Sequence, residues 1–224
     1  MLTPIDGPRM PPAAGGKPTS IVVLLHGYGS NGADLMTLAP HLARLLPNAQ
    51  FVSPNAPEPV PMAPGGYQWF GLTRMDPHEL ERGVERAAPT VQKFLDRELE
   101  RYQVPPERLA LVGFSQGTMM ALHAGLRRPT LAGILGFSGA LPAPGKLKAE
   151  AKGAPPVLLV HGDLDDMVPI AAMFDAAEGL AKAGLSAQWH ISGGLTHAIG
   201  PDGLALGGEF LRAALTGKLA QPAI

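Results

Sequence analysis

Short runs of apolar and β-branched residues recur along the chain, and longer stretches with helical spacing separate them. The runs are almost continuously apolar, which is typical of strands buried on both faces of a sheet. They predict strands at residues 21–25, 50–53, 109–114, 132–137, 156–162 and 187–192. Strands of this kind are usually parallel and are covered by helices on each side.

The stretches between the strands carry apolar residues at intervals of three and four, which is the spacing of one helix face. They predict helices at residues 34–46, 77–102, 116–127, 170–183 and 201–215. Pro89 predicts a kink or a second helix start, because proline lacks the N–H that a helix interior needs. The alternation predicts an α/β fold, with a mostly parallel sheet flanked by helices on both faces.

Composition divides the chain into three parts. Residues 1–20 contain five prolines and three glycines and predict an irregular lead-in with at most one edge strand. We expect a single domain over residues 21–215, in which the Pro/Gly-rich stretch at 55–71 forms no long regular element. Residues 216–224 predict a frayed tail.

The predicted strands at 132–137 and 156–162 are separated by only 18 residues. That connection is too short for a large cap domain over the carboxyl end of the sheet. Ligands of open α/β sheets bind beyond the carboxyl ends of the strands. We therefore expect an open, shallow cleft there.

Charge and cysteine content narrow the class of protein. Eighteen basic and nineteen acidic residues give a net charge of −1, and no basic stripe predicts binding of nucleic acid. The absence of cysteine excludes disulfides, thiolate nucleophiles and Cys-based zinc sites. No secretory signal is visible and the apolar runs are too short to span a membrane, so we expect a cytoplasmic protein without stable membrane insertion. The sequence leaves open whether the protein forms a homodimer.

The segment Gly113-Phe114-Ser115-Gln116-Gly117 has the pattern G-x-S-x-G and lies between a predicted strand and a predicted helix. This is the setting of a nucleophile elbow, whose sharp turn lifts the serine hydroxyl to the top of the sheet. Side chains at the glycine positions would collide with the strand and the helix. Ser115 is the predicted nucleophile; an incidental serine in a tight turn is the alternative that the flanking elements disfavour.

A serine nucleophile needs a base, and the base needs an acid that orients it. In hydrolases with this elbow, the acid and then the histidine follow the serine along the chain. The segment HGDLDDMVP offers Asp163, Asp165 and Asp166; we favour Asp165, with Asp166 as a helix cap and Asp163 as a loop brace. His197, in the glycine-rich loop GGLTHAI after the last predicted strand, is the predicted base.

A second glycine-rich turn, His26-Gly27-Tyr28-Gly29, follows the first predicted strand. Backbone N–H groups in such a turn can stabilise the charge that develops on a carbonyl oxygen during acyl transfer, together with the N–H of Gln116. An ordinary strand-to-helix turn is the alternative. No H-E-x-x-H, Walker or dinucleotide-binding pattern occurs, so neither a metal nor a nucleotide cofactor is expected.

Four segments in this order resemble the phospholipase/carboxylesterase family of α/β-hydrolases, which includes acyl-protein thioesterases and small bacterial carboxylesterases. They are LLHGYGSNGADL, GFSQGTMMAL, HGDLDDMVP and GGLTHAI, within a resemblance that covers residues 20–215. The resemblance implies an α/β-hydrolase fold and a triad of Ser115, Asp165 and His197.

The resemblance also implies that the backbone N–H groups of Tyr28 and Gln116 form the oxyanion hole. The segment YQWFG is similar to the family's aromatic segment beside the acyl pocket, which implies that Trp69 forms a wall of that pocket. Together with the apolar character of the loops, this predicts an acyl-binding face formed by Met62, Trp69, Phe70, Leu141 and Leu195; for each of them plain core packing is the alternative.

We expect a serine carboxylesterase that hydrolyses short- to medium-chain esters or thioesters through an acyl-enzyme and needs no cofactor. Its partner would be a small-molecule ester or thioester. The alternatives are an acyl-protein thioesterase or lysophospholipase with the same triad, peptide cleavage by that triad, and a non-catalytic binding module on the same fold.

Overall fold

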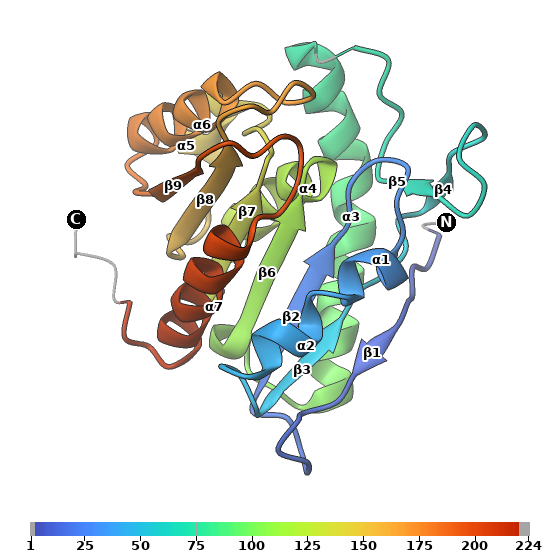
Figure 1. Ribbon diagram of the computed structural model, residues 1–224, viewed down its shortest axis with the longest axis vertical. Helices are drawn as coiled ribbons and strands as arrows, with labels where there is room; N and C mark the ends of the chain where they lie inside the picture. The colour runs from blue at the N-terminus through green and yellow to red at the C-terminus, as the bar shows by residue number, and fades with distance from the viewer. Residues whose placement is uncertain (1–2, 75, 220–224) are drawn as a thin grey trace.

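The structure of the protein is a computed structural model that describes residues 3–74 and 76–219. Its centre is a seven-stranded sheet in the order β1-β3-β2-β6-β7-β8-β9, shown in Figure 1. The pairs from β3 to β9 are all parallel, and β1 joins β3 antiparallel at one edge. The strands are β1 (Arg9–Met10), β2 (Ser20–Leu25), β3 (Ala49–Val52), β6 (Leu109–Phe114), β7 (Gly133–Phe137), β8 (Val157–Gly162) and β9 (Gln188–Ser192).

Each predicted strand is present, with bounds that differ from the prediction by one residue at most. All six residues of β2 and all six of β8 are buried, as continuous apolar runs predict. In contrast, β9 is exposed at its start because it lies at the sheet edge and has a neighbour on one side only. The edge strand foreseen in the lead-in is β1.

The helices are α1 (Gly32–Met36), α2 (Ala39–Ala43), α3 (Pro77–Tyr102), α4 (Gln116–Leu126), α5 (Pro144–Glu150), α6 (Ala171–Lys182) and α7 (Pro201–Leu215). Four of the five predicted helices are present within one residue of their predicted bounds, and α5 was not predicted. The single helix predicted for 34–46 is wrong: two short helices replace it, because Pro40 has no N–H to donate to the carbonyl of Met36. Pro89 was expected to mark a kink or a second helix start. No second start occurs, because α3 continues through Pro89.

Side chains that alternate along the strands enter two separate cores. Val23 and Leu111 pack in the core beneath α3, α4, α5 and α6, whereas Val22 and Val112 pack in the core beneath α1, α2 and α7. Figure 1 shows α1, α2 and α7 in front of the sheet and α3 behind it. The sheet is therefore covered by helices on both faces, which confirms the predicted architecture.

Two short elements lie in stretches that the sequence pattern left irregular. A hairpin of β4 (Glu58–Pro59) and β5 (Tyr67–Gln68) occupies part of the Pro/Gly-rich stretch, and Tyr67 bridges to Ser30 in the loop after β2. The connection between β7 and β8 contains one helix, α5, of seven residues. Of the tail expected to fray, residues 220–224 lie outside the described part of the chain.

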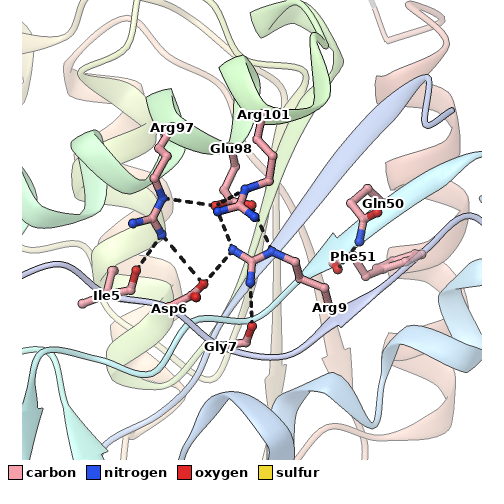
Figure 2. A network of polar contacts seen from close by, with 9 residues as sticks. All are labelled: Ile5, Asp6, Gly7, Arg9, Gln50, Phe51, Arg97, Glu98 and Arg101. Atoms are coloured by element: carbon pink, nitrogen blue, oxygen red, sulfur yellow. Dashed lines mark hydrogen bonds and ion pairs between the residues drawn. The ribbon is translucent and has the colours of Figure 1, made fainter.

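A network of charged side chains ties the lead-in to α3 (Figure 2). Glu98 on α3 is fully buried, and its carboxylate contacts the guanidinium groups of Arg9, Arg97 and Arg101 at 2.9, 3.4 and 3.5 Å. Arg9 also pairs with Asp6 at 2.6 Å. The lead-in lacks long regular structure, yet this network fastens it to the helix.

Candidate active site

The pentapeptide between β6 and α4 forms a strained turn centred on Ser115. The φ and ψ of Ser115 are 53° and −119°, a conformation that side chains other than glycine rarely adopt. A Cβ atom at Gly113 would lie 2.4 Å from the backbone nitrogen of Thr118, and one at Gly117 would lie 1.8 Å from the carbonyl oxygen of Leu25. Only glycine fits at either position, which explains the G-x-S-x-G pattern physically.

Asp165 and His197 meet at the carboxyl ends of β8 and β9. Nδ1 of His197 lies 2.8 Å from Oδ2 and 3.0 Å from Oδ1 of Asp165. The backbone N–H groups of Met167 and Val168 donate to Oδ1 of the same carboxylate at 3.0 and 2.9 Å. Because a carboxylate only accepts hydrogen bonds, Nδ1 of His197 is the donor of this contact and Nε2 is the ring nitrogen left for other partners.

The carboxylate of Asp165 is kept ionised. Burial would raise the pKa of Asp165, but hydrogen bonds from the Val168 N–H and the His197 ring hold this pKa below its usual value. Nε2 of His161, the penultimate residue of β8, lies 3.3 Å from Oδ2 of Asp165 and 2.7 Å from the carbonyl oxygen of Val168. The acid therefore stays charged and its loop is held from two sides.

The other two aspartates of the HGDLDDMVP segment, Asp163 and Asp166, have different surroundings from Asp165. Oδ1 of Asp163 accepts a 2.6 Å hydrogen bond from the N–H of Gly194, so Asp163 braces the loop that carries His197. Asp166 is exposed, and it does not cap a helix, since the N-cap of α6 is Ile170 without a side-chain hydrogen bond. The cap expected at Asp166 is wrong because α6 begins four residues later than such a cap requires.

Ser115 and His197 line the same pocket, which has a volume of about 250 Å³. The ring of Phe114 packs against the His197 ring, with centroids 4.8 Å apart. No hydrogen bond joins the Ser115 hydroxyl to the ring in the described structure. Such bonds are often long without substrate and shorten in the reacting complex, so the arrangement suits a nucleophile beside its base.

Two unpaired backbone N–H groups border this pocket. Tyr28 and Gln116 both line it, and their N–H groups donate to no atom of the described residues. Gln116 is the first residue of α4, so its N–H is one of those that a helix leaves without an internal acceptor. Both groups were expected to bind the oxyanion, and both are available to a ligand.

The residues expected to form the acyl-binding face do not gather around Ser115. Trp69 and Phe70 are buried, at 1% and 0% exposure, and lie outside the pocket wall. Met62 is 93% exposed on the turn between β4 and β5, and Leu195 is half-buried in the histidine loop. Leu141 lines a second, neighbouring pocket.

Trp69 is buried because its polar groups have internal partners. Its indole Nε1 donates to the carbonyl oxygen of His26 at 2.8 Å, and its backbone N–H donates to Oε1 of Gln116 at 2.9 Å. The expectation that Trp69 faces the acyl chain is therefore corrected: the side chain does not line the pocket and connects the segments of His26 and Gln116. Apolar character alone does not distinguish a pocket wall from a support.

The apolar wall comes instead from residues that sequence reasoning missed. They are Leu72, Phe114, Met119, Met167 and Val168. Met119 stands four residues after Ser115 on α4, hence one helical turn from the nucleophile, and that spacing was the available signal. Met167 is 65% exposed beside the acid, in a loop whose shape the pattern did not predict.

Across residues 3–74 and 76–219, no three His, Asp or Glu side chains are grouped so that they could hold a metal ion. None of the helices in the described chain is both long and apolar enough to cross a membrane.

The sheet, the elbow and the acid–histidine pair together define the α/β-hydrolase fold. The sequence model of the phospholipase/carboxylesterase family matches residues 12–215, and the chain belongs to that family. Acyl-protein thioesterase 1 of Saccharomyces cerevisiae is 29% identical over 211 residues, which is 87% of this chain and 92% of the relative. Acyl-protein thioesterase 1 of Schizosaccharomyces pombe is 35% identical over 67% of this chain and 70% of its own length.

Solved structures of related proteins superpose over most of the chain. Esterase PE8 is 44% identical and has a TM-score of 0.89, with 94% of this chain and 99% of its own covered. SOBER1 of Arabidopsis thaliana is 26% identical with a TM-score of 0.78, over 88% of this chain and 99% of its own. The fold predicted from the sequence pattern and the family resemblance are both confirmed.

Proposed function

We propose that this hydrolase is a serine carboxylesterase, with Ser115 as nucleophile, His197 as base and Asp165 as the orienting acid. The observation that carries the proposal is the shared pocket: the strained Ser115 and the His197 ring, paired with a buried carboxylate, line one cavity of about 250 Å³. The family and the esterase relatives support hydrolysis of carboxylic esters or thioesters.

In the first half-reaction Ser115 Oγ attacks the substrate carbonyl carbon while Nε2 of His197 takes the hydroxyl proton. The imidazolium that forms is stabilised by Asp165 across the 2.8 Å contact. The carbonyl oxygen becomes negative and accepts hydrogen bonds from the N–H groups of Tyr28 and Gln116. Nε2–H then protonates the departing alcohol or thiol, and the acyl group stays on Ser115.

In the second half-reaction water replaces the leaving group. Nε2 of His197 removes a proton from the water, whose oxygen attacks the acyl carbon. The same two N–H groups stabilise the second tetrahedral intermediate. Its collapse returns the proton to Ser115 Oγ and releases the carboxylic acid. No further group is needed for either half.

Short- to medium-chain acyl groups suit the pocket, because its walls are mainly apolar and its volume is small. A thioester is the second candidate, since two relatives are acyl-protein thioesterases. The same triad can cleave either bond. Tyr28 and Met167 line the pocket and are exposed at 44% and 65%, so we expect a large leaving group to extend past them into solvent.

A substrate panel tests the proposal. The wild-type protein is assayed on p-nitrophenyl esters of C2 to C16 acids, on acyl thioesters of matching length and on an S-acylated peptide. We expect the highest kcat/KM on one of the shorter esters or thioesters. A kcat/KM at least tenfold higher on the acylated peptide than on any small substrate would support the thioesterase reading instead.

The nucleophile is tested by Ser115→Ala, with Ser186→Ala on an exposed loop as the matched control. Loss of a triad nucleophile lowers kcat by about 10⁴- to 10⁶-fold, while Ser186→Ala should remain within twofold of wild type. A fluorophosphonate probe should label Ser115 in wild type and in the control only. A wild-type protein that neither turns over the panel nor takes the probe would favour a binding module.

A further inference from the structure

His26 is a buried histidine that the reaction steps do not use. It follows the last residue of β2, is 0% exposed and does not line the pocket at Ser115. Its ring nevertheless makes two hydrogen bonds to backbone atoms. Nε2 lies 3.0 Å from the nitrogen of Ala56, and Nδ1 lies 2.7 Å from the carbonyl oxygen of Gly27.

These two contacts fix the protonation state of the ring. The backbone nitrogen of Ala56 can only donate, so Nε2 must be the acceptor and carries no proton. The carbonyl oxygen of Gly27 can only accept, so Nδ1 must carry the proton. Burial lowers the pKa of His26, which keeps this neutral form in place.

The hydrogen bond to Gly27 determines where the next N–H is directed. A trans peptide group is planar, and its C=O and N–H point in opposite directions. The peptide that joins Gly27 to Tyr28 has its oxygen held by Nδ1 of His26 and, at 3.3 Å, by the N–H of Ser30. Its N–H, which belongs to Tyr28, is thereby turned to the opposite side and has no acceptor in the described chain.

Trp69 connects the segment that carries the Tyr28 N–H to the residue that carries the Gln116 N–H. Trp69 donates from Nε1 to the carbonyl oxygen of His26 and from its backbone N–H to Oε1 of Gln116. Nε2 of Gln116 in turn donates to the carbonyl oxygen of Phe70 at 2.8 Å. The rings of His26 and Trp69 lie 5.5 Å apart. The Tyr28 and Gln116 segments are therefore supported by one buried scaffold.

We propose that His26 is a positioning residue: its Nδ1–H holds the Gly27–Tyr28 peptide plane so that the Tyr28 N–H is directed at the oxyanion. The inference rests on the proposed acyl transfer at Ser115. It assigns His26 no contact with substrate. The competing explanation is that His26 only fills the core beside Trp69.

Two substitutions separate these explanations, because each keeps one of the two hydrogen bonds. In His26→Asn the side-chain amide can place a donor where Nδ1 stands, but the acceptor for Ala56 is lost. In His26→Gln the longer side chain can place an acceptor where Nε2 stands, but the donor to Gly27 is lost. Each leaves one buried polar group unpaired, so both should lower the melting temperature by a similar amount.

The proposal predicts a difference in turnover between the two variants. Removal of an oxyanion donor lowers kcat by about 10²- to 10³-fold, so a misdirected donor in His26→Gln should cost about 10- to 10²-fold, with KM within threefold. His26→Asn should keep kcat within about threefold. Inhibition by a trifluoromethyl ketone, which forms an oxyanion on Ser115, should weaken in parallel with kcat. Equal kcat losses in the two variants would show that His26 is only a core residue.

A measurement on the unmodified protein keeps the proposal testable if the variants do not fold. The ¹⁵N chemical shifts of the His26 ring at pH 7 should identify Nδ1 as the protonated nitrogen and Nε2 as the bare one. A proton on Nε2 would overturn the proposal. If the wild-type protein hydrolyses none of the panel, the proposed function fails, whereas an active wild type with indistinguishable variants refutes only the role of His26.

Discussion

Asp165 and Glu98 are both carboxylates with no exposed side-chain surface, yet their partners differ. Asp165 accepts hydrogen bonds from two backbone N–H groups and faces the imidazole of His197. Glu98 contacts three guanidinium groups, from Arg9 and from two arginines of its own helix (Figure 2). The first lies in the loop after β8, the second near the end of α3.

The comparison shows that the partner, and not the burial, decides what a buried carboxylate can do. Guanidinium groups are always charged, so the charge of Glu98 is compensated at every stage and only holds the structure together. An imidazole is neutral until it receives a proton. In the proposed mechanism the charge of Asp165 is therefore available to stabilise His197 when that ring takes the proton of Ser115.

The largest expected effect is on turnover at Asp165. Asp165→Asn removes the charge and can impose the wrong imidazole tautomer, so we predict a loss of about 10²- to 10⁴-fold in kcat with a modest change in KM. Asp163→Asn and Asp166→Asn serve as matched controls on the same loop. They should cost about 1 kcal/mol of stability or less, chiefly at Asp163, which braces Gly194.

One ester at one pH, with melting temperatures measured alongside, is sufficient for this test. A larger kcat loss at Asp163 or Asp166 than at Asp165, in proteins that melt normally, would contradict the assignment of the acid.

At Glu98 we expect the opposite result, a loss of stability without loss of turnover. Glu98→Gln leaves three arginines without their common partner, and breaking a buried ion pair costs about 3 kcal/mol. Urea unfolding should show a lower free energy of unfolding, while kcat at 20 °C stays within twofold. Glu100→Gln, two residues away and exposed, should change stability by less than about 0.5 kcal/mol. A kcat loss above tenfold in folded Glu98→Gln would mean that the two carboxylates are coupled.

His123 provides a third buried ionisable group, one that has neither kind of partner. Its Nδ1 has no hydrogen-bond partner within the described chain, and burial, aided by the nearby Arg127 charge, lowers its pKa to about 4. The unfolded state, with an ordinary histidine pKa of about 6.5, binds the proton more readily. The free energy of unfolding should therefore fall as the pH drops from about 6.5 toward 4, by about 2 kcal/mol.

The pH dependence can be isolated with His123→Leu, which fills similar space and does not titrate. The difference in unfolding free energy between wild type and variant should shift in favour of the variant as the pH falls through this window. A difference that stays constant from pH 7 to pH 4 would show that His123 does not remain neutral in the folded protein.

The smallest effects are expected within the arginine network itself. Arg9 donates from Nε and Nη2 to both oxygens of Glu98 and is 22% exposed, whereas Arg101 makes one contact at 3.5 Å and is 46% exposed. Exposed pairs contribute little. Arg9→Gln should cost about 1 kcal/mol and Arg101→Gln less than about 0.5 kcal/mol in urea unfolding. Equal losses of unfolding free energy in the two variants would indicate that Glu98 is stabilised by the number of nearby positive charges and not by the geometry of their contacts.

Much of the fold could be predicted from the chain alone, because its determinants are local. The continuous apolar runs identified the buried strands, and the alternation with helical stretches predicted a parallel sheet covered on both faces. The elbow could also be foreseen, since Gly113 and Gly117 stand next to the residue whose turn requires them. The order of Ser115, Asp165 and His197 along the chain then identified the candidate triad.

Other features were decided only by contacts between distant segments. Trp69 was expected in the pocket wall, but its hydrogen bonds to His26 and Gln116, 43 and 47 residues away, hold it in the buried interior outside that wall. Glu98 is polar, yet it occupies a position on the buried stripe of α3, three residues after Leu95. A charge is tolerated there because Arg9 of the distant β1 donates to both carboxylate oxygens, in addition to the contacts from two arginines of α3 itself.

The glycine-rich turn at residues 26–29 shows which features the sequence determines and which the tertiary structure determines. A glycine-rich turn after a buried strand is readable in the chain, because it depends on residues 26–29 alone. The direction of the Tyr28 N–H depends on the rotation of one peptide plane. That rotation follows from the proton on Nδ1 of His26, which the N–H of Ala56, 30 residues further along, determines. A tautomer is set by partners in space, so only the folded chain could decide it.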